Sequence, residues 1–393
     1  MIYAQYGHGP GSVPNEGFTC ALIDGAILSC QSETPARMRE ICSHLKIFDV
    51  EILIDTQLHA LFLPEAKLGS IPQYKYYVPR QLSEGDLANI TKMRRLAIKA
   101  MEQQESLGAT SLLIPTVTVE SFQSFQFPLV LALANATVES YRKKTSLPLL
   151  QTLVINESAF ANEAGLDAAL NLLSTLPVAG FYFVLNRSTR EYPALLTANT
   201  LRNVMKFIYV LTVLNEFKLV CGYADVPGLA YIASGAHAIA TGWHNSCRQH
   251  SNYKYRQSKG RQAKRRVTCQ DILSPILIDD LQIAFDRKCI DLLIDDSPYL
   301  SPLRTGKPVE SAWTKEDGTL QHWSVLSQVA SDLKAHKPGI ARLARLAMLL
   351  QIAETRIAEA RTAGVVFDSR SGIGQIFELT KAVTDFRETL QNV

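Results

Sequence analysis

The chain lacks any uninterrupted apolar run of about 18 residues, the length that a membrane-spanning helix needs. Its first residues, MIYAQYGHGPGS, also lack the charged start and apolar stretch of a secretion signal. The seven cysteines are odd in number and scattered, with no CxxC or CxC pair, which is typical of reduced thiols. We therefore expect a cytoplasmic protein with no membrane contact and no disulfide framework.

Several motifs that mark cofactor or catalytic sites are also missing. No GxGxxG opens a helix, which weighs against a dinucleotide-binding domain, and no GxSxG marks a nucleophilic serine. His244, Cys247 and His250 have a spacing that zinc ligands can adopt, but no cysteine knuckle accompanies them. Unpaired side chains are the better interpretation, so we expect no metal and no cofactor.

Composition places the chain among globular proteins. Of its 393 residues, 47% are hydrophobic and 20% are charged, which separates it from disordered chains. The formal net charge of +3 is too small to indicate a partner by itself. The distribution of charge along the chain is therefore more informative than its sum.

Short β-rich segments alternate with helical segments up to about residue 245. After an irregular lead-in over 1–20, we expect strands at 20–29, 51–55, 111–118, 149–156, 180–186, 219–223 and 237–241, with 76–78 as a weaker eighth. Fully apolar strands such as SLLIP and FYFVL suit a sheet buried on both faces. This rhythm predicts an α/β fold, a (β/α)8 TIM-like barrel, with an open doubly wound sheet as the alternative.

The character of the chain changes after the barrel segments. We divide it into a barrel over 1–247, a basic and irregular insertion over 248–318, and a C-terminal helical region over 319–393. Helices in the last part are expected at about 320–336, 339–363 and 371–391. The helical tail is expected to pack on the barrel or on a second subunit, so a homo-oligomer or larger complex is an alternative to a monomer.

Polar side chains stand where the expected strands end, and parallel barrels bind their ligands at that edge. Asp55 follows the apolar run ILI, where an acid can acquire a tuned pKa or can simply cap the next turn. The other strand ends carry polar groups that we also consider: Asn156, Glu157, Tyr223, Asp225 and Thr241. The small residues of ASGAHAIATG fit a phosphate cradle or close helix–strand packing equally well.

A basic run over 248–266, interleaved with tyrosines and free of acidic residues, follows the barrel. Cations neutralise phosphates and tyrosines stack on bases, so the run predicts nucleic-acid contact, with a solvated surface loop as the alternative. Its candidate contact residues are Arg248, Tyr253, Lys254, Tyr255, Arg256, Lys259, Arg261, Lys264, Arg265 and Arg266.

The order of these motifs resembles that of the tRNA-guanine transglycosylase family. Asp55-Thr56-Gln57 stands where that family has D-S-G-G-F-Q, and the stretch 222–248 resembles its late unit, which reads roughly G-V-G-x-P-x-D-L followed by a helix and a second strand motif. The resemblance implies that Asp55 contacts the base, that Gln57, Asn156 and Glu157 help to read it, and that His322 heads a C-terminal helix. The family's nucleophilic aspartate would fall near Ala240 or Thr241, and its C-x-C-x2-C zinc cluster is missing.

The resemblance therefore implies a nucleic-acid-binding, transglycosylase-like protein that acts on a nucleobase of tRNA or DNA, by base exchange or glycosidic cleavage. Its DNA-acting relatives insert 7-deazaguanines. Asp55 and Asp225 are the expected catalytic residues, while Gln57, Asn156, Glu157, Tyr223 and Thr241 are the expected substrate-binding residues. Two alternatives remain: a non-catalytic nucleic-acid-binding subunit of a larger assembly, and a phosphosugar-type barrel enzyme that uses the ASGAHAIATG cradle.

Overall fold

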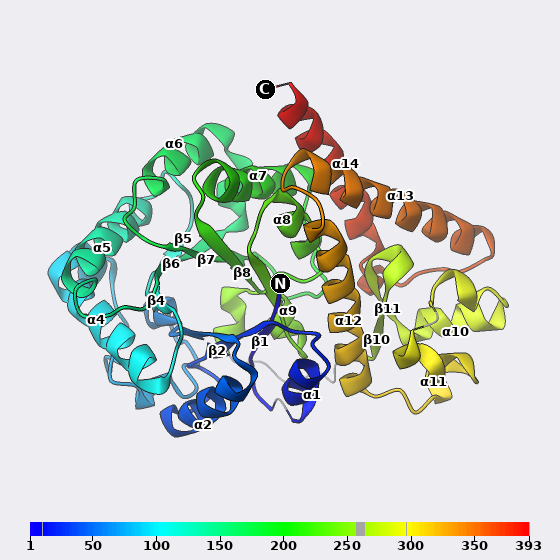
Figure 1. The fold of residues 1–393 in the computed structure, drawn as a ribbon, viewed down its shortest axis with the longest axis horizontal. Helices are drawn as coiled ribbons and strands as arrows, with labels where there is room; N and C mark the ends of the chain where they lie inside the picture. The colour runs from blue at the N-terminus through cyan, green and yellow to red at the C-terminus, as the bar shows by residue number, and fades with distance from the viewer. Residues whose placement is uncertain (10, 257–263, 296, 393) are drawn as a thin grey trace.

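A computed structural model describes residues 1–9, 11–256, 264–295 and 297–392. A barrel of parallel strands occupies one side of the molecule, and the C-terminal region covers the other (Figure 1). Within the described residues, no helix combines the length and the apolar content needed to cross a membrane.

Eight parallel strands form a nearly closed barrel in the order β3-β2-β1-β9-β8-β7-β6-β4, which confirms the (β/α)8 prediction. Strand β1 pairs with both β2 and β9, and this double pairing joins the beginning of the barrel to its end. The short β5 adds to β6. The strands are β1 Ile2–Gln5, β2 Gly25–Ser29, β3 Glu51–Asp55, β4 Leu112–Ile114, β5 Thr118–Val119, β6 Leu149–Asn156, β7 Gly180–Asn186, β8 Lys218–Gly222 and β9 Ala238–Thr241.

Two strand predictions are wrong. The lead-in over 1–20 contains β1, a fully buried strand in the middle of the sheet order. The weaker candidate at 76–78 is a turn and loop, in which Tyr76 is buried and its hydroxyl donates to the Thr56 carbonyl at 2.6 Å. The aromatic Tyr76 therefore packs beneath the loop after β3 and is not part of a strand.

Helices follow most strands and pack around the outside of the barrel (Figure 1). Helices α3 and α4 meet at Asn89, whose side chain caps the second of them, and α4 ends at Gly108. The barrel helices are α1 Val13–Thr19, α2 Pro35–Leu45, α3 Glu84–Ala88, α4 Ile90–Leu107, α5 Gln126–Tyr141, α6 Glu163–Leu173, α7 Ala198–Tyr209, α8 Gly228–Ser234 and α9 Asn245–Arg248.

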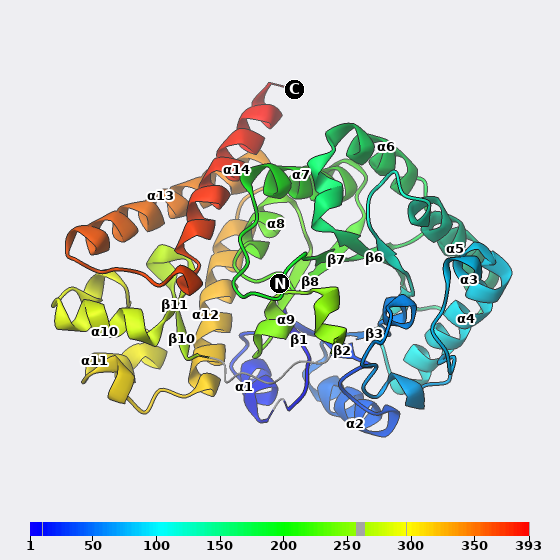
Figure 2. The same cartoon turned by 180° about the vertical axis from the view of Figure 1, so that it is seen from behind.

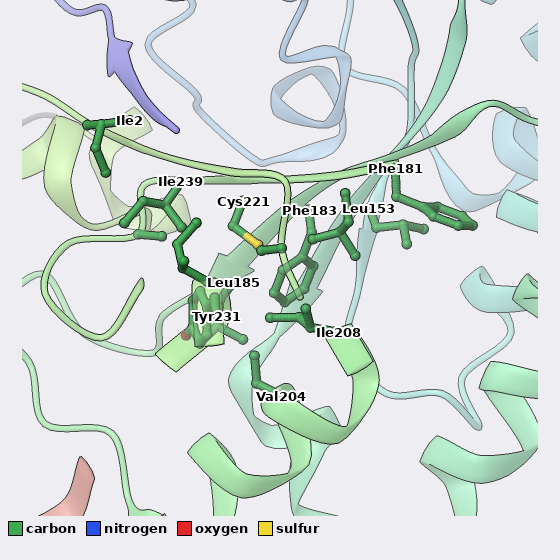
Figure 3. Packing of buried hydrophobic residues seen from close by; sticks show 14 of the residues in the cluster. Ile2, Leu153, Phe181, Phe183, Leu185, Val204, Ile208, Cys221, Tyr231 and Ile239 are labelled. Atoms are coloured by element: carbon green, nitrogen blue, oxygen red, sulfur yellow. The ribbon is translucent and has the colours of Figure 1, made fainter. Parts of the chain in front are cut away.

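Two apolar clusters hold the barrel together. Outside the sheet, Phe183 and Cys221 pack against Val204, Ile208 and Tyr231 of α7 and α8 (Figure 3). Inside the barrel, alternate residues of the strands form a second cluster, which includes three tyrosines. These are Tyr3, Tyr182 and Tyr223, and each brings one polar hydroxyl into an otherwise apolar interior.

The C-terminal helical region packs on the barrel of its own chain. Helix α12 lies beside α1 and α8, α14 lies against α7, and α13 packs on α14 (Figures 1 and 2). The three expected helices are confirmed with shifted ends. The elements that follow the barrel are β10 Arg266–Cys269, β11 Ser274–Leu277, α10 Ile278–Asp286 and α11 Ser301–Arg304 in the insertion, and then α12 Lys315–Lys334, α13 Ile340–Thr362 and α14 Ile373–Gln391.

Candidate active site at the barrel mouth

Asp55 ends strand β3, inside the carboxyl end of the barrel. Its carboxylate is only 4% exposed, accepts the Gln57 backbone N–H at 3.0 Å, and lies 3.4 Å from the Tyr182 hydroxyl, which donates to it. Burial raises its pKa to about 6, although the positive charge of Lys254 acts in the opposite direction. Asp55 is therefore poised to change protonation near neutral pH, as a catalytic acid must.

Gln57 connects this carboxyl group to the other side of the barrel. Its backbone adopts a left-handed conformation with a φ of 52°, just after the strand. Its side-chain oxygen accepts from the Ser29 hydroxyl at 2.9 Å, and its amide group donates to the Tyr223 hydroxyl at 3.3 Å. These bonds hold the side chain in one orientation across the mouth.

Lys254 brings the basic run into the same cluster. Its ammonium group donates to the Tyr223 hydroxyl at 3.0 Å and lies 4.5 Å from the centre of the Tyr223 ring. Burial lowers the pKa of Lys254 to about 8, and Asp55 offsets only part of that effect. Asp55, Gln57, Tyr182, Tyr223 and Lys254 thus form one connected group, which we call the mouth cluster.

The segment 250–255 covers the mouth cluster. The His250 carbonyl accepts from Arg187 N–H at 3.0 Å, and the Asn252 N–H donates to the Asn186 side chain at 2.9 Å, which ties the segment to the end of β7. Tyr255 is fully buried, and its hydroxyl lies 3.0 Å from His59 Nε2. Helix α9, labelled in Figure 2, stands between β9 and this cover in the chain.

Residues of this cover line two cavities, and Arg256 lines both. The first has a volume of about 300 Å³ and a largely polar wall that includes Asn156, Asn252 and Tyr253. The second has a volume of about 480 Å³ and a cationic wall that includes Lys67 and Lys254. The first we call the amide pocket and the second the cationic pocket.

The strand-end residues predicted to read a base do not all converge. Asn156 lines the amide pocket, where its amide donates to the Glu120 carboxylate at 2.8 Å. Glu157 instead forms an ion pair with Arg187 at 2.6 Å. Burial alone would raise the pKa of Glu157, but Arg187 and Ser188 hold it below its ordinary value. Glu157 therefore positions Arg187 at the wall of the pocket.

Asp225 lines one pocket together with Tyr223 of the mouth cluster, but its polar contacts lead to other residues. Its carboxylate is 3.0 Å from His322 Nε2 of α12 and accepts from the Tyr192 hydroxyl. Burial alone would raise its pKa, but His322 and the nearby Arg248 lower it to about 2. Thr241, also buried, places its hydroxyl 3.4 Å from the same His322 nitrogen. These contacts join the barrel to the C-terminal region and leave Asp225 ionised.

The basic run divides into buried and exposed residues. Arg248 and Tyr255 are buried, and Arg265 and Arg266 donate to backbone carbonyls of the C-terminal region. Lys264 is exposed and forms an ion pair with Asp279. Lys259 and Arg261 lie outside the described residues.

Tyr253 and Arg256 remain as an exposed pair. The Arg256 guanidinium lies 4.6 Å from the centre of the Tyr253 ring, which is 37% exposed. A stacked aromatic and guanidinium of this kind offers both a π-face and a positive charge at the surface.

Sequence reasoning missed several residues of this site. Tyr182 belongs to the apolar strand FYFVL and carries no motif of its own. The signal that could have found it is the alternation of a strand, which places every second side chain inside the barrel. Lys67 and His59 belong to the loop after β3 and carried no motif. Across the described residues, no group of His, Cys, Asp and Glu is arranged to hold a metal ion.

Neither a scan against protein-family models nor a search of curated proteins gives a match to this chain. The functional argument therefore rests on the geometry of the barrel mouth.

Proposed function

We propose that the protein binds a nucleic acid over the barrel mouth and acts on one of its nucleobases, by base exchange or glycosidic cleavage. The observation that carries the proposal is the link, through Tyr223 and Gln57, between a buried carboxyl group and the basic run. Asp55 is buried with a pKa of about 6, and Lys254 of the basic run belongs to the same cluster.

Asp55 supplies the chemistry in this proposal. In its protonated form it donates a proton to a ring nitrogen of the departing base while the bond from that base to the sugar breaks. The sugar carbon then takes an incoming nucleophile, which is a second base in exchange or water in cleavage. In its ionised form Asp55 is instead the candidate nucleophile. Tyr182 and Gln57 hold the carboxyl group in place in either case.

The amide pocket fits the recognition of a base. The Asn156 and Asn252 side chains offer both hydrogen-bond donors and acceptors on its wall, and Tyr253 adds an aromatic face. Because Asp55 is only 4% exposed, a base reaches it from this pocket only when residues 252–255 move aside. Asp225 has no part in the reaction in this proposal, because His322 and Tyr192 already occupy its oxygens.

A second candidate is a non-catalytic nucleic-acid-binding subunit. The observation in its favour is that a hydroxyl group, that of Thr241, stands near the place of the related family's nucleophilic aspartate, and it is turned towards His322. Asp55 would then be the single carboxyl group of the mouth cluster. Base exchange needs both a proton donor and a nucleophile, and no second acid of the cluster could take the other role.

One experiment separates the two candidates. Wild-type protein and Asp55→Asn are incubated with tRNA and with duplex DNA whose guanines carry a radiolabel, and both binding and released base are measured. If the wild type releases base and Asp55→Asn binds equally but releases none, the protein is an enzyme that uses Asp55. Binding without release by either protein supports the second candidate. Absence of binding to both polymers contradicts both candidates.

A further inference from the structure

The cationic pocket has a wall with positive charge and no acid. Its lining residues are His8, Gln31, Lys67, Leu68, Gly69, Lys254 and Arg256, around a volume of about 480 Å³. The pocket shares Arg256 with the amide pocket, and Lys254 on its wall is hydrogen-bonded to Tyr223 of the mouth cluster. A ligand bound in it would therefore contact Lys254, a residue of the mouth cluster that contains Asp55.

Within the described part of the chain the cations of this pocket form no ion pair, and the nearby charge of Asp55 acts on Lys254 without a direct contact. Among residues 1–9, 11–256, 264–295 and 297–392, no carboxylate lies within ion-pair distance of Lys67, Lys254 or Arg256. The stretch 257–263 contains no Asp or Glu either. Three neighbouring cations repel one another unless an anion offsets their charge. The arrangement thus favours a bound anion.

The wall of the pocket is held in shape by its backbone. Gly69 has a φ of +53°, and a Cβ atom at this position would lie 2.2 Å from the Gln31 carbonyl oxygen, so only glycine fits. The Gln31 side chain donates to the Lys67 carbonyl at 2.9 Å, and Lys67 N–H donates to the Tyr255 carbonyl at 2.6 Å. These bonds join the loop after β3 to the cover of the mouth and place the two lysines on one wall.

We propose that the cationic pocket binds a phosphate group of the nucleotide whose base is presented to Asp55. This inference rests on the proposed function for the identity of the ligand, but the pocket itself can be tested independently. Phosphate oxygens accept hydrogen bonds from ammonium and guanidinium groups, and these charge-assisted bonds are stronger than neutral ones. Lys254 would then contact the phosphate on one side and the mouth cluster on the other.

The test is calorimetric titration of the full-length protein with inorganic phosphate, with the four ribonucleoside 5′-monophosphates and with the four corresponding nucleosides. The variant is Lys67→Gln, and the matched control is Lys75→Gln, which removes an exposed lysine from the same loop outside the pocket. Inorganic phosphate and at least one monophosphate are expected to bind. Lys67→Gln should weaken both by about tenfold, the loss of one charge-assisted hydrogen bond, while Lys75→Gln leaves them unchanged. Thermal unfolding verifies that both variants are folded.

The outcomes separate the pocket from the proposed function. Absence of phosphate binding, or equal weakening by Lys67→Gln and Lys75→Gln, overturns the phosphate site. Nucleosides that bind as tightly as their monophosphates also overturn it, while leaving the proposed function intact. If inorganic phosphate binds and no nucleoside monophosphate binds more tightly than it does, the pocket is a site for free phosphate. That result overturns the assignment to a nucleotide. If Lys67→Gln weakens phosphate binding but the wild-type protein releases no base, the result supports the phosphate site and contradicts the proposed enzymatic activity.

Discussion

Replacement of Asp55 by asparagine is expected to stabilise the folded protein at neutral pH. The Asp55 carboxyl group is buried, and burial raises its pKa from the ordinary 3.8 to about 6. The unfolded chain returns the group to water, where its pKa is ordinary. The difference between about 6 and 3.8 corresponds to about 3 kcal/mol of unfolding free energy that the wild type loses on ionisation, at about 1.4 kcal/mol per pKa unit.

The sign of the effect fixes its dependence on pH. Because the folded state holds the proton more tightly than the unfolded state, Asp55 contributes its full stability below pH 3.8 and loses it as the pH rises through about 6. An asparagine carries no charge at any pH. The variant should therefore match the wild type near pH 4 and exceed it by about 3 kcal/mol at pH 7.5.

Denaturant unfolding of both proteins at these two pH values measures the difference directly. Other carboxylates titrate in both proteins alike, so their contributions cancel in the comparison. A variant that is less stable than the wild type at pH 7.5, or a difference that does not change with pH, would refute the reasoning. A less stable variant would mean that Lys254 and Tyr182 stabilise the carboxylate more than burial destabilises it, and a difference independent of pH would mean that these effects cancel.

Three further substitutions test the neighbouring contacts. Asp225→Asn should lower the unfolding free energy by about 2 kcal/mol at pH 7, because contacts with His322 lower the pKa of Asp225 to about 2; unchanged stability in denaturant would mean that these contacts contribute nothing. This stability is present above pH 3.8 and is lost as the pH falls through about 2. Tyr253→Ala should weaken single-stranded nucleic-acid binding by about 1 to 3 kcal/mol, measured by filter binding, and equal binding would exclude stacking on this ring. Arg256→Gln should reduce the slope of log K against log salt by about one; a slope equal to that of the wild type would remove this arginine from the interface.

The barrel could be predicted from the sequence because its strands are buried on both faces. Segments such as Leu149–Asn156 and Gly180–Asn186 read as continuous apolar runs with turn residues between them. Strand β1 could not be predicted in the same way, because it has only four residues and carries the polar Gln5, which is fully buried. Its assignment as a strand depends on pairing with β2 and with β9, which are far away in sequence.

The candidate site could be predicted only in part. Asp55 and Gln57 were placed correctly at a strand end, because the carboxyl edge of a parallel barrel is a property of the fold. The partner of Asp225 was not predictable, since His322 comes from a helix of the C-terminal region. No local pattern reports such a contact, which depends on how α12 packs against the barrel.

The basic run shows why charge alone does not locate an interface. From the sequence, its cations are equivalent, but the fold treats them differently: Arg248 donates to the Gly242 carbonyl inside the barrel, whereas Arg256 stands at the surface between two pockets. A buried arginine bound to backbone cannot be exchanged for a phosphate without unfolding its surroundings. Electrostatic contact with a polymer must therefore be made by the exposed cations. Lys254 is half-buried between the cationic pocket and Asp55, so a phosphate bound to Lys254 would change the electrostatic environment of the Asp55 carboxyl group.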